Sequence, residues 1–167
     1  MRILTVFKIG VSFSVVLAIG IFLLSSFNPD MTENKNTMSV IDVSDLECSG
    51  NARCISGTIT RIVDGDTIHV DGQSIRFALS STPELNEYGG IEAKYFVEQI
   101  CPVGTEALVD EDDGQTEGSY GRVIGVIYCN GINLNEAVLE EAHAWLASGF
   151  CDKSEFSTHT WAQKYGC

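Results

Sequence analysis

The sequence predicts an α+β fold, a small closed β-barrel that carries about three helices and follows an N-terminal hydrophobic helix. Two patterns predict this fold: short runs of β-forming residues that end at Asp-Gly turns, and later segments whose apolar residues have helical spacing. The chain has 167 residues, of which 44% are hydrophobic. That size supports one folded domain with accessory segments and excludes two large domains.

The N-terminal 30 residues differ in character from the rest of the chain. Arg2 and Lys8 flank the start of an apolar run over residues 9–27, which only Ser and Gly interrupt. The run is just long enough to span a bilayer as a helix, and no Ala-x-Ala cleavage site is present. We therefore predict that residues 1–30 are a signal peptide or a membrane anchor. Because the positive charges precede the run, the remainder is expected outside the cytoplasm, either secreted or anchored to the membrane.

A polar segment connects this N-terminal part to the domain. Residues 31–47 are rich in Asn, Thr, Ser and Asp, which is typical of a tether. The domain is expected over residues 48–167. It opens with three strands joined by tight turns at Asp64-Gly65 and Asp71-Gly72, over residues 55–63, 67–70 and 74–80.

Helical spacing begins after the third strand. Residues 91–101 place apolar side chains about one turn apart, and Pro102 ends the helix. Two further strands are expected at residues 106–110 and 122–129. The acidic stretch 110–118 between them is expected to be a solvated loop, because its pattern lacks the spacing of an EF-hand.

The C-terminal part is predicted to be helical. Asn133, with Glu136 three residues later, resembles a capping box and opens a helix over residues 134–147. A short last helix is expected over residues 154–164. The complete order, three strands, a helix, two strands and a helix, favours a five-stranded OB-type barrel.

All six cysteines follow residue 47. An even number of cysteines in an exported chain indicates disulfides. Many connectivities are possible, and order and spacing favour the pairs Cys48–Cys54, Cys101–Cys129 and Cys151–Cys167. Zinc binding is the alternative, but no C-x-x-C pair is present and the three histidines have no ligand spacing.

The chain is strongly acidic. Lys and Arg number 10 against 23 Asp and Glu, which gives a formal net charge of −13. Because affinity for nucleic acid comes mostly from basic side chains, this balance argues against non-specific adhesion to a polyanion. A polyanionic substrate would require positive charge concentrated at one site.

Three short stretches concentrate charge where strands begin or end. Asp64 and Asp66 bracket Gly65, and a hairpin turn with solvated carboxylates is the simpler interpretation of this stretch alone. Arg76 lies inside an apolar strand, where its charge needs an acidic partner or an anion. Arg122 follows Tyr-Gly at the start of another strand, and taken alone it would be an ordinary surface arginine.

Five motifs follow one another along the domain: Asp-Gly-Asp-Thr at 64–67, Ile-Arg-Phe at 75–77, Thr-Pro-Glu at 82–84, Tyr-Gly-Arg at 120–122 and Gly-Ile-Asn-Leu-Asn-Glu-Ala at 131–137. In the order and spacing of these motifs, the chain resembles the staphylococcal nuclease family over residues 55–147. The resemblance implies an OB-type barrel with three helices and calcium-dependent hydrolysis of phosphodiester bonds.

The resemblance also implies a metal site. Asp66 matches the family's first calcium-binding aspartate, Asp64 the acidic residue beside it, and Thr82 the residue that offers a backbone carbonyl. Hard oxygen ligands of this kind suit Ca²⁺. Ser81 stands where the family has a second calcium-binding aspartate, so the site has one negative charge fewer and calcium binding is expected to be weaker.

The catalytic residues follow from the same resemblance. Arg76 and Arg122 match the arginines that hold the scissile phosphate, and Glu84 matches the carboxylate that activates or orients water. Tyr120 matches a substrate-binding tyrosine near the nucleotide phosphate, and Ser119 replaces a phosphate-contacting lysine. Paired guanidinium groups can bind phosphoryl oxygens and stabilise the charge of the transition state.

Three functions are compatible with these residues. The first is an extracytoplasmic, monomeric, calcium-dependent endonuclease that cuts DNA, with RNA as a second candidate substrate, and has little sequence specificity. The second is a catalytically weakened or inactive OB-fold module that only binds nucleic acid, which Ser81 and the acidic composition favour. The third is a structural domain in which the arginines pair with Asp64, Asp66 or Glu84.

Overall fold

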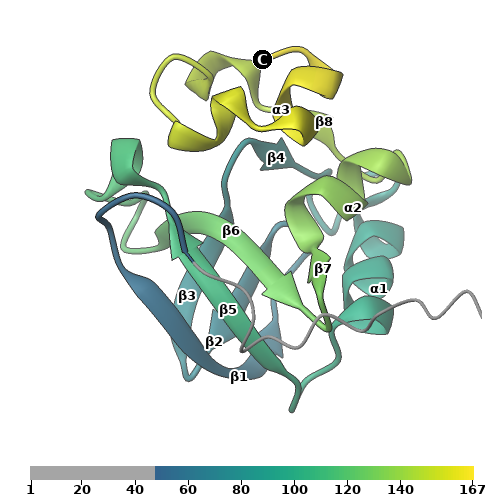
Figure 1. Cartoon of the computed structure of the whole chain (residues 1–167). Coiled ribbons are helices and arrows are strands. Elements are labelled where there is room, and N and C mark those ends of the chain that lie inside the picture. The colour runs from purple at the N-terminus through teal and green to yellow at the C-terminus, as the bar shows by residue number, and fades with distance from the viewer. Residues whose placement is uncertain (1–47) are drawn as a thin grey trace, which may run out of the picture. The chain divides into compact units, whose positions relative to one another are not determined.

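The computed structural model describes residues 48–167 (Figure 1). The predicted signal peptide or anchor (1–30) and the tether (31–47) lie outside the described residues, and both stay predictions. Within the described part, none of the helices has the length and apolar character needed to cross a membrane.

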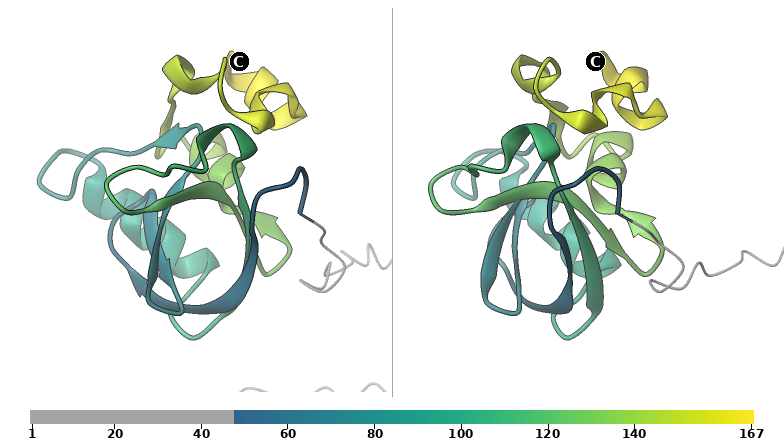
Figure 2. Two further views of the ribbon diagram at one scale, coloured as in Figure 1. Left: turned by 90° about the vertical axis from the view of Figure 1, so that its left-hand side faces the viewer. Right: turned by 60° about the vertical axis from the view of Figure 1, so that its left-hand side comes forward.

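Five strands close into a mixed β-barrel, which Figure 2 shows from two further sides. They are β1 (Cys54–Ile62), β2 (Thr67–Val70), β3 (Gln73–Phe77), β5 (Glu106–Glu111) and β6 (Val123–Cys129). Neighbours pair antiparallel in the order β3-β2-β1-β5-β6, and a parallel pairing of β3 with β6 closes the barrel. The predicted OB-type α+β fold is confirmed.

The barrel is filled by the β-branched side chains that the alternating pattern predicted. Ile59, Ile68, Ile75 and Ile127 are all buried in one hydrophobic cluster at the centre of the barrel. The helix α1 (Gly90–Ile100) adds buried side chains to the same cluster. The tight turn between β2 and β3 needs two positive φ angles, which Asp71 (φ 47°) and Gly72 (φ 83°) supply.

The last part of the chain, from β8 onward, lies over one end of the barrel (Figure 1). Before it, β7 (Ile132–Asn133) pairs with the end of β6 and leads into α2 (Leu134–Glu140). The segments over the barrel end are β8 (Trp145–Leu146), η3 (Ser148–Phe150), η4 (Glu155–Thr158) and α3 (Thr160–Tyr165). A second hydrophobic cluster, which includes Leu79, Ile124, Phe156 and Trp161, joins this part to the barrel strands. These segments therefore form a fixed wall beside the end of the barrel.

Two predicted helices are wrong in extent. The helix expected over residues 134–147 ends at Glu140, because Ala142 adopts a positive φ of 57° and the chain then forms β8. The strand β8 pairs with β4 (Ser80–Ser81), a long-range contact that no local pattern indicates. The last helix is divided at His159 into η4 and α3.

The six cysteines form the three predicted disulfides. The pairs are Cys48–Cys54, Cys101–Cys129 and Cys151–Cys167, and no cysteine is free. The alternative of a zinc–cysteine site is therefore wrong. The last pair joins the C-terminal residue to the segment after η3.

A fully buried asparagine joins α2 to the barrel. The Asn135 amide nitrogen donates to the carbonyl oxygens of Ala78 (2.8 Å) and Gly125 (3.1 Å), and its Oδ1 accepts from the Ile127 N–H (3.1 Å). The Ser80 hydroxyl donates to the Asn135 carbonyl at 2.8 Å. This one residue satisfies backbone groups of β6 and of the segment after β3.

Replacing Asn135 by alanine is expected to lower the free energy of unfolding by about 3 kcal/mol, because three hydrogen bonds to buried backbone groups are lost, and of these groups the Gly125 carbonyl oxygen keeps the Ala78 N–H as a second donor. Urea unfolding followed by circular dichroism measures the loss. Asn51→Ala is the control, since Asn51 is exposed and should change stability by less than about 0.5 kcal/mol. Equal stabilities of the two variants would contradict this role of Asn135.

Candidate active site

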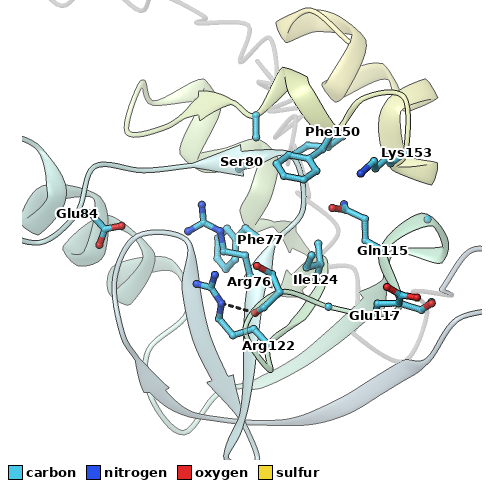
Figure 3. Close-up of a pocket in the computed structure, with 16 residues that line it drawn as sticks. Arg76, Phe77, Ser80, Glu84, Gln115, Glu117, Arg122, Ile124, Phe150 and Lys153 are labelled. Atoms are coloured by element: carbon cyan, nitrogen blue, oxygen red, sulfur yellow. Dashed lines mark hydrogen bonds between the residues drawn. The ribbon is translucent and has the colours of Figure 1, made fainter.

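The closing seam of the barrel brings the two predicted arginines together. Because β3 and β6 pair in parallel, Arg76 of β3 lies opposite Ile124, two residues after Arg122. Both arginines extend into one open pocket of about 600 Å³ (Figure 3). Phe77 and Ile124 also line this pocket.

Arg76 is held by two side chains behind the pocket. Its Nη1 forms an ion pair with Oδ1 of Asp66, and its Nη2 donates to the Ser81 hydroxyl at 2.8 Å. Burial lowers the pKa of Arg76, and the nearby positive charge of Arg122 adds to this effect. An arginine remains charged under these conditions, so the pocket holds two guanidinium charges side by side.

Asp66 is almost completely buried, with 1% of the residue exposed. Its Oδ1 accepts from the Thr67 hydroxyl (3.3 Å) as well as from Arg76. Its Oδ2 accepts from the backbone N–H (2.6 Å) and the hydroxyl (3.2 Å) of Thr82. Both carboxylate oxygens therefore already have partners, and Asp66 fixes the positions of Arg76 and Thr82.

Arg122 is held more loosely than Arg76. Its Nε donates to the Ser119 carbonyl at 3.2 Å, and its Nη1 reaches the Thr67 hydroxyl at 3.4 Å. Among residues 48–167 no carboxylate lies within ion-pair distance of it. Its charge is therefore available to an anion in the pocket.

The other predicted residues lie around this centre. Glu84 is exposed on the loop after β4 and lines the pocket on the side opposite the loop that carries Gln115 (Figure 3). Asp64 is half-buried, and its Oδ1 accepts the Asp66 N–H at 3.1 Å. Tyr120 is 99% exposed on the turn before Arg122 and does not line the pocket. The structure thus places the three predicted catalytic residues at one pocket. Of the predicted metal ligands, Asp66 contacts Arg76, and Thr82 and Asp64 contact Asp66.

A family model described as staphylococcal nuclease homologue matches residues 74–164, which is more than half of the chain. This chain belongs to the staphylococcal nuclease family. The matched region contains Arg76, Glu84 and Arg122, so the pocket lies within the family domain.

Three curated Bacillus proteins are similar to this member of the staphylococcal nuclease family. An uncharacterized protein of Bacillus anthracis, pXO1-141, is 32% identical over 103 residues. In Bacillus subtilis, endonuclease YncB is 28% identical over 106 residues, and the SPbeta prophage-derived endonuclease YokF is 30% identical over 101 residues. The matches cover 56%, 57% and 54% of this chain and 48%, 49% and 33% of these relatives, respectively. More than half of the length of each relative therefore lies outside the region that matches this chain.

Members of the staphylococcal nuclease family are typically metal-dependent, which raises the question of whether the residues present fit a calcium ion. Calcium takes about six to eight oxygen ligands. Within the described residues, no group of three or more His, Cys, Asp or Glu side chains is placed to hold a metal. Asp66 is paired with a cation, and Ser81 supplies a neutral hydroxyl that accepts from the same cation. As they stand, these residues do not fit a calcium ion.

Sequence reasoning missed one wall of the pocket. Phe150, Lys153 and Gln115 line it on the side of the C-terminal segments (Figure 3). Phe150 is 46% exposed, so part of its ring is accessible in the pocket. The sequence offered one signal for this wall, Lys153, because basic residues are few in this chain. Only the tertiary fold, however, places Lys153 near the arginines.

The loop that forms this wall is held by buried and half-buried carboxylates. Asp110 accepts from the N–H and the hydroxyl of Ser49, both at 2.9 Å. Glu155 accepts from the Asp113 N–H (2.9 Å) and from the Ser49 hydroxyl (3.3 Å), and its own N–H donates to Asp112 (3.1 Å). The expectation of a solvated loop is wrong at its start, because Asp110, Glu111 and Asp112 are buried. We call Asp110, Asp112, Asp113 and Glu155 the acidic cluster.

Burial raises the pKa of Asp110 and of Glu155, and the charge of Asp113 raises both further. At Asp110, the hydrogen bonds from Ser49 and the charge of His159 partly oppose this rise in pKa. At Glu155, the hydrogen bonds from the Asp113 N–H and from Ser49 partly oppose it. A raised pKa means that the folded state binds protons more tightly than the unfolded chain. The resulting stabilisation is complete below the unfolded pKa and is lost as the pH rises through the folded pKa.

Replacing Glu155 by glutamine is therefore expected to stabilise the fold at pH 7, by about 1 kcal/mol. Glutamine can accept the Asp113 N–H and donate to the Ser49 hydroxyl, without a negative charge at this half-buried position. Thermal unfolding of both proteins from pH 4 to pH 8 should show a gain that disappears toward acid pH. Glu98→Gln, an equal charge change on the exposed face of α1, is the control. A gain independent of pH, or equal in the control, would contradict this account of the acidic cluster.

Proposed function

We propose that this chain is an extracytoplasmic, calcium-dependent nuclease that hydrolyses phosphodiester bonds of DNA, with RNA as a second substrate. The observation that carries the proposal is the pocket at the barrel seam, where Arg76 and Arg122 converge and Glu84 contributes a carboxylate. The endonuclease names of two relatives support the same activity.

The pocket residues suit attack on a phosphodiester. The substrate is an anion, and further negative charge develops on its oxygens during attack. Guanidinium groups donate paired N–H groups to phosphoryl oxygens, so Arg76 and Arg122 would orient the phosphate and stabilise the transition state. The exposed carboxylate of Glu84 is free to hold a water molecule or to accept its proton.

The far wall of the pocket suits a nucleotide beside the scissile phosphate. Phe150 offers an exposed aromatic face, Lys153 an ammonium group and Gln115 an amide. Stacking on an aromatic side chain tolerates every base, so we expect little sequence specificity. The net charge of −13 predicts weak substrate binding that decreases further as salt is added.

Calcium and location are part of the proposal. The family supports a metal, and calcium is the ion we propose, although the residues around Asp66 as they stand supply too few free oxygen ligands for it. Because Arg76 already forms an ion pair with Asp66, we expect calcium to support cleavage only at high concentration. The three disulfides support a location outside the cytoplasm, where thiols are oxidised.

The test is to incubate the purified, oxidised full chain with single-stranded DNA, double-stranded DNA and RNA, with calcium and with a chelator. We expect cleavage of DNA that the chelator abolishes. No cleavage of any substrate at any calcium concentration up to millimolar would overturn the proposal.

A second function is a module that binds nucleic acid without cutting it. The observation that favours it is the Arg76–Asp66 ion pair together with the neutral Ser81. In the same assay it predicts a shift of labelled DNA on a native gel with no shortening of the strand.

A further inference from the structure

An apolar patch lies outside the pocket, on α1 and the loop before it. Its members are Leu85, Tyr88, Ile91 and Tyr95, and each is at least 40% exposed. We call these four residues the α1 patch. Of the nine large hydrophobic side chains that are exposed among residues 48–167, four lie within residues 85–95. Single exposed apolar residues are ordinary, but a concentration of them in one short segment is not.

Helical spacing keeps one face of α1 outside the core. The helix lies at the side of the barrel (Figure 1), and its buried residues are Gly90, Ala93 and Val97. Ile91 and Tyr95 are four residues apart, so they lie together on another face, which is exposed. This face and the loop before α1 form an open groove of about 390 Å³, which is lined by Leu85, Ile91, Lys94, Tyr95 and Glu98. Three members of the α1 patch therefore share one groove.

Carboxylates accompany the α1 patch along the same segment. Residues 84–98 contain four exposed glutamates, Glu84, Glu87, Glu92 and Glu98, and one basic residue, the half-buried Lys94. Among residues 48–167, none of these glutamates forms an ion pair. The apolar groove therefore lies in an acidic surface whose negative charges are not compensated within the described part of the chain.

This charge distinguishes three kinds of occupant. A nucleic-acid strand would bring its phosphates to the glutamates, and these like charges repel each other. A second copy of the chain, related by a two-fold axis, would place the glutamates of one patch against those of the other. A protein segment with basic side chains beside apolar ones complements both the carboxylates and the groove. An amphipathic helix has apolar side chains every three or four residues, which suits the spacing of Ile91 and Tyr95.

We propose that the α1 patch binds a basic amphipathic helix of a partner protein. The apolar side chains of that helix lie in the groove against Ile91 and Tyr95, and its lysines or arginines pair with the surrounding glutamates. Glu84 lines the pocket and Leu85 lines the groove, so the two places meet at adjacent residues of one loop. The binding itself does not depend on nuclease activity.

Fluorescence anisotropy of the full chain with a labelled model peptide tests the proposal. The probe is a synthetic helix of about four turns that carries leucines on one face and lysines on the other. A peptide of the same composition in scrambled order is its control, because it has the same charge but no apolar face. We expect micromolar binding of the amphipathic peptide, and binding of the scrambled peptide that is at least about 10-fold weaker. Added salt should weaken the binding, since the ion pairs are exposed.

Two variants, each with a matched control, locate the binding. Ile91→Ala should weaken it at least about 10-fold, because the groove loses an apolar contact, whereas Ile132→Ala removes the same side chain from β7, outside the groove, and should have no effect. Glu98→Gln should weaken binding about 3-fold through the loss of one exposed ion pair. Glu106→Gln makes the same change at an exposed position of β5 and should leave the affinity unaltered.

Equal affinities for the two peptides would overturn the proposal, as would equal affinities of Ile91→Ala and Ile132→Ala, because the attraction would then belong to the acidic chain as a whole. A DNA oligonucleotide that loses affinity in Ile91→Ala would assign the groove to the substrate instead. A dimer that sedimentation velocity detects, and that Ile91→Ala dissociates, would assign it to a second copy. A chain that binds the peptide at the groove but cuts no nucleic acid refutes the nuclease function alone, and a chain that cuts DNA without this binding refutes the docking site alone.

Discussion

Replacing Arg122 by alanine is expected to lower the rate of DNA cleavage by about 1000-fold while leaving the fold intact. Removal of one preorganised donor to a developing negative charge typically costs about 100- to 1000-fold, and a charged donor lies at the upper end. The fold should tolerate the change, because Arg122 makes two long hydrogen bonds and no ion pair in the described part of the chain. Initial rates at saturating calcium, together with a thermal melt, measure both effects.

Arg122→Lys and Arg61→Ala make this result specific. Lysine keeps the charge but loses the planar fork of donors, so it should restore only a small part of the rate. Arg61→Ala removes one charge outside the pocket and should keep most of the rate. If Arg122→Ala is as active as Arg61→Ala, the phosphate does not bind at this arginine.

Replacing both Cys101 and Cys129 by alanine is expected to lower the free energy of unfolding by about 4 kcal/mol. The bond joins the end of α1 to β6 across 28 residues of sequence, and both half-cystines are buried in the barrel cluster. Constraint of a loop of this length contributes between about 3 and 4 kcal/mol through the unfolded state, and lost packing adds to that. Denaturant unfolding at pH 7 measures the change.

The Cys48–Cys54 pair is the control for this prediction. It spans 6 residues of sequence, and Cys54 is exposed. Its removal should cost about 2 kcal/mol, since a short loop gains less from the constraint. Equal losses for the two pairs would show that loop length and burial do not determine the effect.

Most of the barrel could be predicted because its elements follow local rules. The strand β2 has the predicted bounds, and β1, β3 and β6 are displaced or shortened by a few residues, since alternation of apolar and polar residues carries the signal. The helix predicted over 134–147 was too long because β8 depends on pairing with β4, a tertiary contact that overrides helical spacing.

The site could be predicted in part. Arg76 and Arg122 meet because β3 and β6 pair, and the family motifs already associated them. The ion pair of Arg76 with Asp66 was foreseen only in the structural hypothesis, in which arginines pair with local carboxylates. Phe150 could not be placed from sequence, because its position depends on how the C-terminal segments cover the barrel end.

The acidic composition has a different meaning once the site is known. Buried carboxylates such as Asp110 and Asp112 serve the fold, and Glu111 pairs with Arg53 through two bonds of 2.7 Å. The net charge therefore does not describe the pocket, where two guanidinium groups converge. It limits affinity for a polyanion, and it is compatible with hydrolysis at one locally positive site.

The most direct test of the central claim is a time course of DNA cleavage by the full chain beside the Arg76→Ala/Arg122→Ala double variant. Both proteins are purified in the same way and assayed on single-stranded DNA with millimolar calcium. Steady shortening of the DNA by the unaltered chain, and none above the protein-free background by the double variant, is the result we predict. Equal cleavage by both proteins, or none by either, would contradict hydrolysis at the arginine pocket.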